Sequence, residues 1–289
     1  MPEIGKSELI INEDGSIFHL HLLPEQLADK IVLVGDPARV KLVASYFDTI
    51  ECQVGSREFY SATGNYKGKR ITVLSHGIGG DNIDIVLTEL DALANIDFTT
   101  REVKKEPRQL TLVRIGTSGA MQKEIPLGGF VASEKSIGYE GAIYFYNNNA
   151  SARDLEFEKA FANECLGSVA ERLRPYVVNS SAPLLEQIAH DMHTGVTISA
   201  NGFYGAQGRA LRLPLQEEET NQRIEAFRFN GKRVTNYEME GAALAGLATL
   251  MGHRALTVCC IIAHRHHKEV NVNYTEKVAE LIKKVLDRI

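Results

Sequence analysis

The chain has 289 residues, of which 44% are hydrophobic and 24% are charged, proportions that are ordinary for a globular protein. This length fits one large α/β domain better than two full domains, so we predict a single domain over residues 1–289. No apolar run approaches the roughly 20 residues that cross a bilayer, and the polar N-terminus lacks a basic segment followed by an apolar one. We therefore expect neither a membrane protein nor a signal peptide.

The charge balance argues against a nucleic-acid partner. The 32 basic and 37 acidic residues leave a net charge of -5, without a long tract of one sign, whereas non-specific nucleic-acid binding needs a concentrated basic face. The cysteines are scattered and show no CxxC spacing; they are Cys52, Cys165, Cys259 and Cys260. This usage favours reduced thiols and a cytoplasmic location.

Short apolar runs rich in β-branched residues alternate with helical patterns along most of the chain. In chain order, we predict a strand at 31–34, a helix at 37–46, a strand at 71–75, a helix at 82–93, strands at 110–115 and 129–133, a helix at 155–172, a strand at 194–199, helices at 217–227 and 240–251, a strand at 255–263 and a helix at 274–286. Nearly continuous apolar strands are typical of central strands covered on both faces. The alternation predicts an α/β fold, a three-layer α/β/α domain around a central mixed, partly barrel-like β-sheet.

Two stretches lie outside this alternation. Residues 1–16 form a polar N-terminal extension. Residues 97–109 are highly charged, with the sequence TTREVKKEPRQ at 99–109, and they interrupt the passage from an apolar helix to a strand. Such a segment is typical of an exposed insertion.

The first candidate anion site is a strand that runs into Gly35, Asp36 and Pro37 and then presents Arg39 in the first turn of a helix. Asp36 as the N-cap and a proline in the first turn indicate a helix start. Backbone N–H groups gather at such a junction and favour an anion such as phosphate. A capped turn with a solvent-exposed arginine explains the same residues, and the spacing alone favours that simpler interpretation.

Two further loops have a similar character. Residues 77–80 contain three glycines after a strand, which lets the backbone approach a ligand, but they match neither the dinucleotide fingerprint nor the phosphate loop. Arg114 lies near the end of an otherwise apolar predicted strand, where an unpaired guanidinium would be costly to bury. Thr117 follows with a hydroxyl that suits a phosphate oxygen. A buried structural ion pair explains Arg114 equally well.

Two polar clusters come later in the chain. Glu238 and Glu240 flank Met239 at a strand-to-helix junction, and carboxylate oxygens can accept both hydroxyls of a vicinal diol. A favourable helix-start charge and an exposed carboxylate explain this pair more simply. Gln207 both donates and accepts hydrogen bonds, whereas Arg209 only donates, so together they can bind a pyrimidine edge. An ordinary glycine-rich turn is the alternative there.

The histidines near the C-terminus make a metal site the less favoured hypothesis. His264, His266 and His267 surround an arginine, and alternate histidines can share one face of a strand. No matched carboxylate or cysteine set accompanies them. The adjacent cysteines at 259–260 lie in an apolar run and are expected to be inert core thiols.

Taken in order, these segments resemble the nucleoside phosphorylase-I family. The matching segments are Gly35–Asp36–Pro37 with Arg39, SREF at 56–59, GIGG at 77–80, RIGT at 114–117 and EME at 238–240. Residues 203–209 are similar to the members of the family that cleave uridine. The resemblance runs from about Phe18 to the last helix. It implies reversible phosphorolysis of uridine to uracil and ribose 1-phosphate in pyrimidine salvage, with inorganic phosphate as co-substrate and no organic cofactor.

The resemblance also implies a role for each matched residue. Phosphate would be bound by Gly35, Arg39, Arg114 and Thr117, with Arg57 reaching across from a partner subunit. The ribose would be held by Met239 and Glu240, with His19 reaching the neighbour's 5′-hydroxyl. The base would contact Phe203, Gln207, Arg209 and Arg265. The implied catalytic set is Arg39, Arg114, Thr117, Glu240, Gln207 and Arg209.

A shared site implies an oligomer. Because His19 and Arg57 would come from a neighbour, a homodimer is the expected minimum, and a ring of three dimers, a hexamer, is compatible with it. Some relatives hold a cation, often K⁺, between subunits; the equivalent residues here are Glu58, Ile78 and Asn82, and Asn82 replaces a serine. The resemblance leaves that cation site open.

The sequence also bears on the rival functions. The segment between Arg254 and Glu269 lacks aspartate, whereas the purine-cleaving members of the family carry one there, so purine nucleosides are disfavoured. His76 stands where bacterial uridine-cleaving members usually carry a small hydroxyl residue. Three rivals stay open: a broader pyrimidine nucleoside phosphorylase that also takes deoxyuridine and thymidine, a non-catalytic nucleoside-binding module, and a hydrolase.

Overall fold

The computed structural model describes residues 3–265 and 267–289. One mixed sheet runs through it, and the open half of this sheet is centred on β1 (Lys30–Val34). β1 pairs in parallel with β4 (Lys69–Ser75) on one side and with β7 (Thr111–Ala120) on the other. β4 continues antiparallel into β3 (Phe59–Tyr66), and β3 into the edge strand β2 (Thr49–Ser56). Because β1, β4 and β7 run in the same direction, their carboxyl ends lie at one edge of the sheet.

The other half of the sheet closes on itself. β7 pairs with β12, β12 with β8, β8 with β10, β10 with β11, and β11 returns to β7. The bounds of these strands are β8 (Phe130–Gly138), β10 (His193–Ser199), β11 (Val234–Glu238) and β12 (Arg254–His264). Two short strands extend it, β9 (Tyr176–Asn179) on β8 and β13 (Glu269–Val270) on β12. The predicted mixed, partly barrel-like sheet is thus confirmed.

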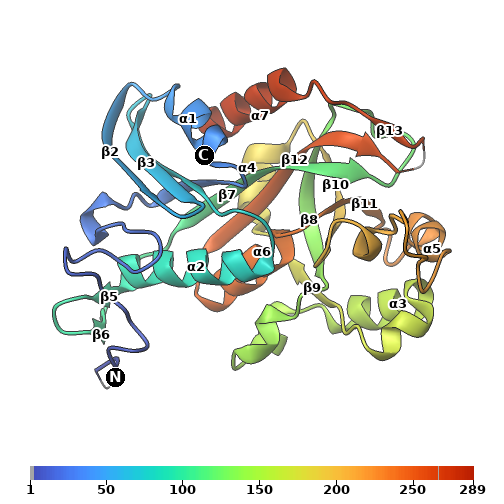
Figure 1. Ribbon diagram of the computed structural model, residues 1–289, viewed down its shortest axis with the longest axis horizontal. Coiled ribbons are helices and arrows are strands. Elements are labelled where there is room, and N and C mark those ends of the chain that lie inside the picture. Colours follow the sequence, from blue (N-terminus) through green and yellow to red (C-terminus); the bar gives the residue numbers. More distant parts are fainter. Residues whose placement is uncertain (1–2, 266) are drawn as a thin grey trace.

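Helices cover both faces of the sheet (Figure 1). One face carries α1 (Pro37–Ala44), α4 (Ala182–Ala189) and α7 (Thr275–Arg288), and the other carries α2 (Gly80–Asn95) and α6 (Gly241–Leu250). The side chains of β1 alternate between these layers: Val32 and Val34 pack in the core under α1 and α7, while Ile31 and Leu33 pack in the core under α2 and α6. This period of two is the pleat of a strand buried on both faces, and it confirms the three-layer prediction.

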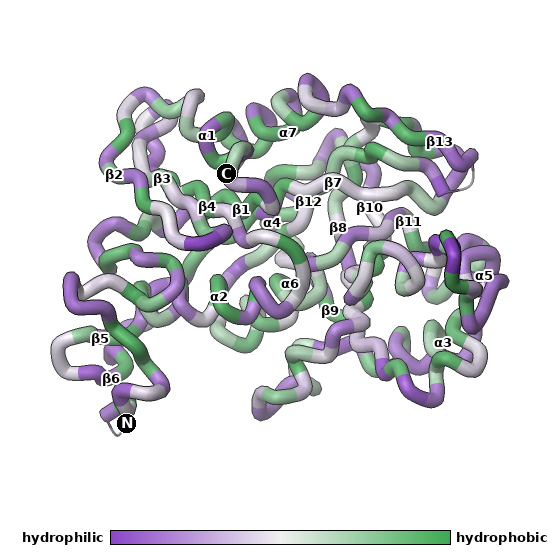
Figure 2. Tube along the Cα trace, in the orientation of Figure 1, coloured by the Kyte–Doolittle hydropathy of each residue, from purple (hydrophilic) through white to green (hydrophobic). Residues whose placement is uncertain are grey.

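A third core lies under two further helices. Aromatic residues of α3 (Leu155–Cys165) and the end of α5 (Thr220–Ala226) pack against β10 and β11. Figure 2 shows that α5 and the residues before it are mainly hydrophilic, in contrast to the strands beside them. In α5, therefore, only the side that faces β10 and β11 contributes to this core.

The predicted elements needed several corrections. The helix predicted at 155–172 was wrong in length, because α3 ends at Cys165, Gly167 has a φ of 55°, and a 3-10 turn follows at Gly167–Glu171. The strand predicted at 110–115 continues to Ala120, so Arg114 lies inside it and not near its end. The β2–β3 hairpin and α4 were missed, in β2 because the strand has no buried residue.

The charged stretch after α2 folds as a small hairpin beside the N-terminal segment (Figure 1). Its strands are β5 (Ile96–Asp97) and β6 (Glu102–Val103). Residues 99–109 are mostly exposed. Arg101 donates to the carbonyl oxygens of Ile4 and Gly5 at 2.8 and 2.9 Å. The insertion and the extension before residue 16 therefore pack on each other.

The cysteines are free thiols, with Cys165, Cys259 and Cys260 buried and Cys52 half-buried. Across the described residues, every helix is too short or too polar to span a lipid bilayer.

Candidate active site

A cavity of about 1060 Å³ opens where several strands end. In α/β sheets ligands bind in the crevice outside the carboxyl ends of the strands, and this cavity is built from the residues that follow β1, β4, β10, β11 and β12, together with the second half of β7. It brings together most of the residues singled out from the sequence. They are Gly35, Arg39, Glu58, Ile78, Asn82, Arg114, Thr117, Phe203, Gln207, Arg209, Met239, Glu240 and Arg265.

Two loops meet at the floor of the cavity because β1 and β4 are parallel neighbours. A Cβ atom on Gly35 would lie 3.4 Å from the carbonyl oxygen of Gly77, so the loops are in contact. Asp36 caps α1 by accepting from the backbone N–H of Ala38 at 2.8 Å. Arg39 is half-buried in the first turn of α1 and makes no ion pair with a described residue. Its guanidinium is therefore free to bind an anion beside the helix N-terminus.

Arg114 is held on three sides in the wall of the cavity. It is 4% exposed. Its Nη1 lies 2.9 Å from Oε2 of Glu238, and its Nη2 donates to Oε2 of Glu240. Burial opposes the charged form of Arg114, but the two carboxylates outweigh it, so its pKa is raised. The interpretation of Arg114 as a member of a buried ion-pair network is confirmed; because Arg114 also lines the cavity, its role as a phosphate ligand stays a prediction.

The third partner of Arg114 is His76, which directly precedes the glycine loop. The Nε–H of Arg114 donates to Nε2 of His76 at 3.2 Å. A ring nitrogen that accepts carries no proton, so the proton of the neutral ring is on Nδ1. Burial and the charge of Arg114 hold the pKa of His76 well below its ordinary value. His76 is consequently a neutral acceptor.

The two glutamates of β11 and its following turn have different tasks. Glu238 accepts from the backbone N–H of Glu240 at 2.8 Å and of Gly241 at 2.9 Å, so it caps α6. The expectation that Glu238 is exposed was wrong, since it is 3% exposed. Glu240 accepts from the N–H of Gly79 at 2.7 Å through Oε1. Burial raises the pKa of Glu240 against the pull of Arg114. Glu240 therefore ties the glycine loop to Arg114.

A cluster of donors forms the opposite end of the cavity. Oε1 of Gln207 accepts from Nη1 of Arg209 at 2.7 Å and from Nη2 of Arg265 at 3.1 Å. The guanidinium of Arg209 also lies over the ring of Phe203, 3.8 Å from its centre. Burial and the nearby charge of Arg265 lower the pKa of Arg209 to about 10. With its oxygen engaged, Gln207 keeps its amide N–H₂ for a ligand, so this end suits a ligand rich in carbonyl oxygens.

Two residues expected at the site do not line this cavity in the described part of the chain. His19 is fixed by Glu89 of α2, which accepts from its backbone N–H at 3.0 Å and lies 2.6 Å from its Nδ1. Arg57 is exposed at the turn between β2 and β3, with a φ of 55°. Both were expected to act on a neighbouring subunit, and their absence from their own cavity is compatible with that.

Two metal sites were considered from the sequence, a K⁺ site between subunits and a site formed by the histidines near the C-terminus. Glu58, Ile78 and Asn82, the residues considered for K⁺, all line the cavity. Of the three histidines, His266 lies outside the described residues, and Nε2 of His264 lies 3.1 Å from the carbonyl oxygen of Gln122. Within residues 3–265 and 267–289, no group of three or more His, Cys, Asp or Glu side chains is placed to hold a metal ion.

Sequence reasoning missed one part of the wall. Lys268, Glu269 and Val270 line the cavity from β13 and the turn before it. Glu269 thus brings a carboxylate to the part of the wall where the sequence lacks the aspartate of the purine-cleaving members. A two-residue strand gives no periodic pattern, so only the polar residues at 267–269 could have indicated this part of the wall.

Comparisons with known proteins agree with this geometry. A family model described as "Phosphorylase superfamily" matches residues 29–289. The chain is 29% identical to the uridine phosphorylase of Thermococcus kodakarensis over 272 residues, which are 93% of this chain and 85% of that one. It is 29% identical to the uridine phosphorylase of Escherichia coli over 273 residues, 91% and 92% of the two chains. It also superposes with a TM-score of 0.87 and 26% identity on a Trypanosoma brucei nucleoside phosphorylase described as showing uridine phosphorylase activity, covering 97% of this chain and 100% of that one.

Proposed function

This chain belongs to the phosphorylase superfamily, and from that premise we propose that it is a uridine phosphorylase, a pentosyltransferase that converts uridine and inorganic phosphate into uracil and ribose 1-phosphate. One observation carries the proposal. A single cavity combines an anion-binding floor at Arg39 and Arg114 with a donor-rich end at Gln207 and Arg209. The names of the relatives from Thermococcus kodakarensis and Escherichia coli support the same substrate.

On the phosphate side, Arg39, Arg114 and Thr117 hold the nucleophile. A phosphate oxygen attacks C1′ of the nucleoside as the bond from C1′ to N1 of the base breaks, and the electron pair of that bond leaves with the base. The sugar passes through a state with positive charge at C1′, which the bound phosphate stabilises. Arg114 supplies a fixed positive charge because Glu238, Glu240 and His76 orient its guanidinium.

On the base side, the departing uracil gains negative charge at N1 and its carbonyl oxygens. Hydrogen bonds from Gln207 and Arg209 strengthen as this charge develops, so they lower the barrier more than they tighten substrate binding. A proton from solvent then completes uracil at N1. Arg265 positions Gln207 by donating to its backbone and side-chain oxygens at 3.0 and 3.1 Å. Phe203 covers a face of the base.

Between these ends, Glu240 and Met239 hold the ribose. The carboxylate of Glu240 already accepts from Gly79 and Arg114, and its remaining lone pairs accept from the 2′- and 3′-hydroxyls. A substrate without the 2′-hydroxyl leaves one of these acceptors unpaired. Uridine is therefore preferred over deoxyuridine and thymidine.

The proposal includes a homodimer in which each site is completed by His19 and Arg57 of the other subunit; a hexamer of three such dimers is compatible with it. Because the carboxylate of Glu89 can only accept, Nδ1 of His19 donates to it, and Nε2 is left for a ribose 5′-hydroxyl. Mixing the variants Arg57→Ala and Glu240→Ala tests this directly. Random exchange should restore about a quarter of wild-type activity, because half of the dimers then carry one intact site.

Two finer points belong to the same proposal. Glu58, Ile78 and Asn82 of one chain supply one carboxylate, one amide and a backbone carbonyl, so a K⁺ ion at the cavity mouth needs ligands from the partner as well. Activity in potassium against tetramethylammonium salts tests that site. The free thiols support a cytoplasmic location.

The decisive experiment is uracil release from uridine with and without inorganic phosphate, with deoxyuridine and inosine as further substrates. Release from uridine that requires phosphate is the expected result. Release without phosphate would make the protein a hydrolase, and binding of uridine without release would make it a binding module. Inosine cleavage would contradict the preference for pyrimidine nucleosides.

A further inference from the structure

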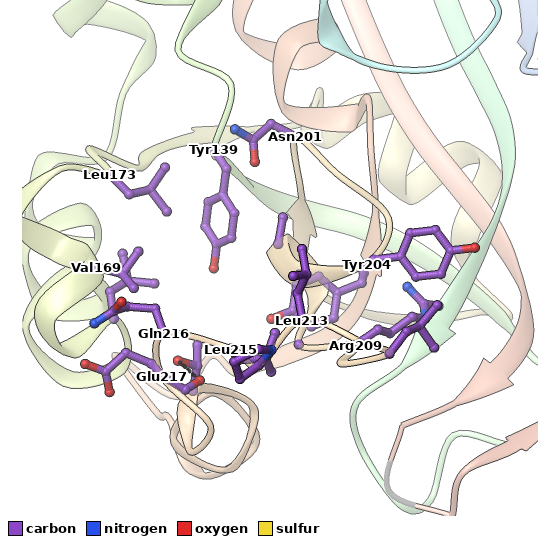
Figure 3. Close-up of a pocket in the computed structure, with 18 of the residues that line it drawn as sticks. Tyr139, Val169, Leu173, Asn201, Tyr204, Arg209, Leu213, Leu215, Gln216 and Glu217 are labelled. Carbon is purple, nitrogen blue, oxygen red and sulfur yellow. Dashed lines mark hydrogen bonds between the residues drawn. The ribbon is translucent and has the colours of Figure 1, made fainter.

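A second cavity lies beside the first and shares Arg209 and Tyr237 with it. It has a volume of about 690 Å³, which is in the range of small-molecule sites. Its wall is formed by the 3-10 turn after α3 and by the loop between β10 and α5 (Figure 3). Most of the lining is apolar: Leu166, Val169, Leu173, Leu211, Leu213 and Leu215.

One polar group in this wall lacks a partner. Tyr139 is 7% exposed, and its hydroxyl makes no hydrogen bond of good geometry with a described residue; the one group that interacts with it is the hydroxyl of Tyr237, whose own proton goes to Asn221 at 3.0 Å. Figure 3 shows this hydroxyl pointing into the cavity. Burial raises the pKa of Tyr139 well above its ordinary value, so the hydroxyl keeps its proton and is a donor. A buried donor without an acceptor is destabilising, and a ligand oxygen would remove that cost.

The charges around the cavity favour an anion. Arg209 and Arg212 both line it, and Arg212 makes no ion pair with a described residue. The carboxylate of Glu217 also lies there but is already engaged, since it accepts from the backbone N–H of Ser168 at 3.0 Å and pairs with Arg223 at 3.1 Å. The amides of Asn201 and Gln216 can donate or accept, so the charged groups left for a ligand among the described residues are the two guanidinium groups.

We propose that this second cavity binds a small organic monocarboxylate with a planar apolar body and a second oxygen at its far end, of the 4-hydroxybenzoate class. The carboxylate pairs with Arg209 and Arg212. The apolar body packs against the leucines, and the far oxygen accepts from Tyr139. In Figure 3, Tyr139 and Arg209 lie on different sides of the cavity, with Leu213 and Leu215 labelled between them. Binding is non-covalent.

Occupancy should act on the first cavity through Arg209. Its guanidinium lies over Phe203 at 3.8 Å and donates to Gln207 at 2.7 Å, so a carboxylate on its other side competes for the same donors. This consequence rests on the proposed function, in which Arg209 binds the base. Because coupling is reciprocal, the acid weakens uridine binding and uridine weakens binding of the acid by the same factor.

Binding is measured on the intact protein by saturation-transfer NMR and calorimetry, with 4-hydroxybenzoate as the probe and benzoate, which lacks the far oxygen, as its control. Val169→Trp fills the cavity and should abolish binding, whereas Val103→Trp on the distant β6 hairpin should not. Tyr139→Phe should weaken the binding of 4-hydroxybenzoate by about threefold to tenfold, which corresponds to the loss of one hydrogen bond. The affinity for benzoate should not change. Tyr144→Phe is its matched control.

The binding measurements do not depend on catalysis, so they separate this proposal from the proposed function. Absence of 4-hydroxybenzoate binding to the wild type, or equal binding to wild type and Val169→Trp, overturns the site. If Val169→Trp does not fold, an unchanged affinity of Tyr139→Phe for 4-hydroxybenzoate is sufficient to overturn the site. In the activity arm, the acid should raise the KM for uridine in the wild type but not in Val169→Trp; an equal increase in both would place the acid in the first cavity and refute the coupling.

Discussion

The hydrogen bond between His76 and Arg114 yields the sharpest mechanistic prediction. His76 contributes a neutral acceptor, Nε2, to a guanidinium whose Nη1 and Nη2 also pair with Glu238 and Glu240. Replacing it by leucine removes the acceptor and keeps the volume close. Replacing it by glutamine keeps an acceptor oxygen. If the role of His76 is to orient Arg114, the two variants should differ strongly in activity.

The size of the effect follows from the kind of bond. A hydrogen bond to a charged group contributes roughly 1.5–3 kcal/mol, and tenfold corresponds to about 1.4 kcal/mol. His76→Leu should therefore lower kcat/KM for phosphate by roughly 10- to 100-fold, while His76→Gln should stay within about threefold. Stability should move differently. His76→Leu leaves the buried Nε–H of Arg114 without its acceptor but also removes Nδ1, which is buried without a partner among the described residues; because these two effects on stability oppose each other, the melting temperature should change little.

The assay is uracil release at varied phosphate and saturating uridine, with thermal unfolding of each variant. A structural role alone would lower stability and activity together in both variants. Leucine kinetics equal to wild type, or glutamine kinetics as poor as those of leucine, would refute the positioning role.

Four other predictions concern residues of the same cavity and His76. Glu240→Gln should lower kcat/KM for uridine by at least about 100-fold and narrow the preference for uridine over deoxyuridine, which paired substrate kinetics would detect. Arg209→Lys loses a planar donor fork, so kcat/KM for uridine should fall by about tenfold or more with the KM for phosphate unchanged; a changed phosphate KM would contradict the assignment. Gly116→Ala places a Cβ 2.7 Å from Nη1 of Arg114 and should reduce phosphate binding more than Gly55→Ala, as phosphate titrations would show. Folding lowers the pKa of His76 from 6.5, so below pH 6.5 the unfolded chain binds more protons than the folded chain. The free energy of unfolding is therefore unaffected by His76 above pH 6.5 and falls as the pH drops below it. In His76→Gln the free energy of unfolding should depend less on pH in that range, as unfolding measured at several pH values would show.

Much of the fold was predictable because its central strands carry their own pattern. The apolar run at 31–34 and the Asp36–Pro37 helix start gave the first strand and helix within a few residues. The edge hairpin of β2 and β3 was not predictable in this way, since the exposed and half-buried residues of β2 include Glu51 and Gln53 and resemble a loop. Its register depends on pairing with β4 and not on local sequence.

The site was predictable as a set of residues but not as a network. Arg114 takes its partners from 38 and 126 residues away, and no local pattern indicates contacts at such separations. For the same reason, the sequence left an ion pair and a phosphate ligand as equal alternatives for Arg114. The wall at 268–270 depends on how β13 pairs with β12, which two residues cannot encode.

The placement of Arg114 rests on the parity of β7. Successive side chains of a strand point to opposite faces: Val113 and Ile115 pack under α1 and α7, whereas Leu112 packs under α2 and α6. Arg114 shares the face of Leu112, the face that α6 and the turn before α2 approach with Glu240 and Gly79. Gly116, two residues on, lies on this face as well, and its missing side chain leaves room for the guanidinium. An arginine followed two residues later by glycine within an apolar strand is thus the local feature that leaves room for a buried cation facing the cavity. A shift of the arginine by one residue would have buried the same charge under α1 without a partner.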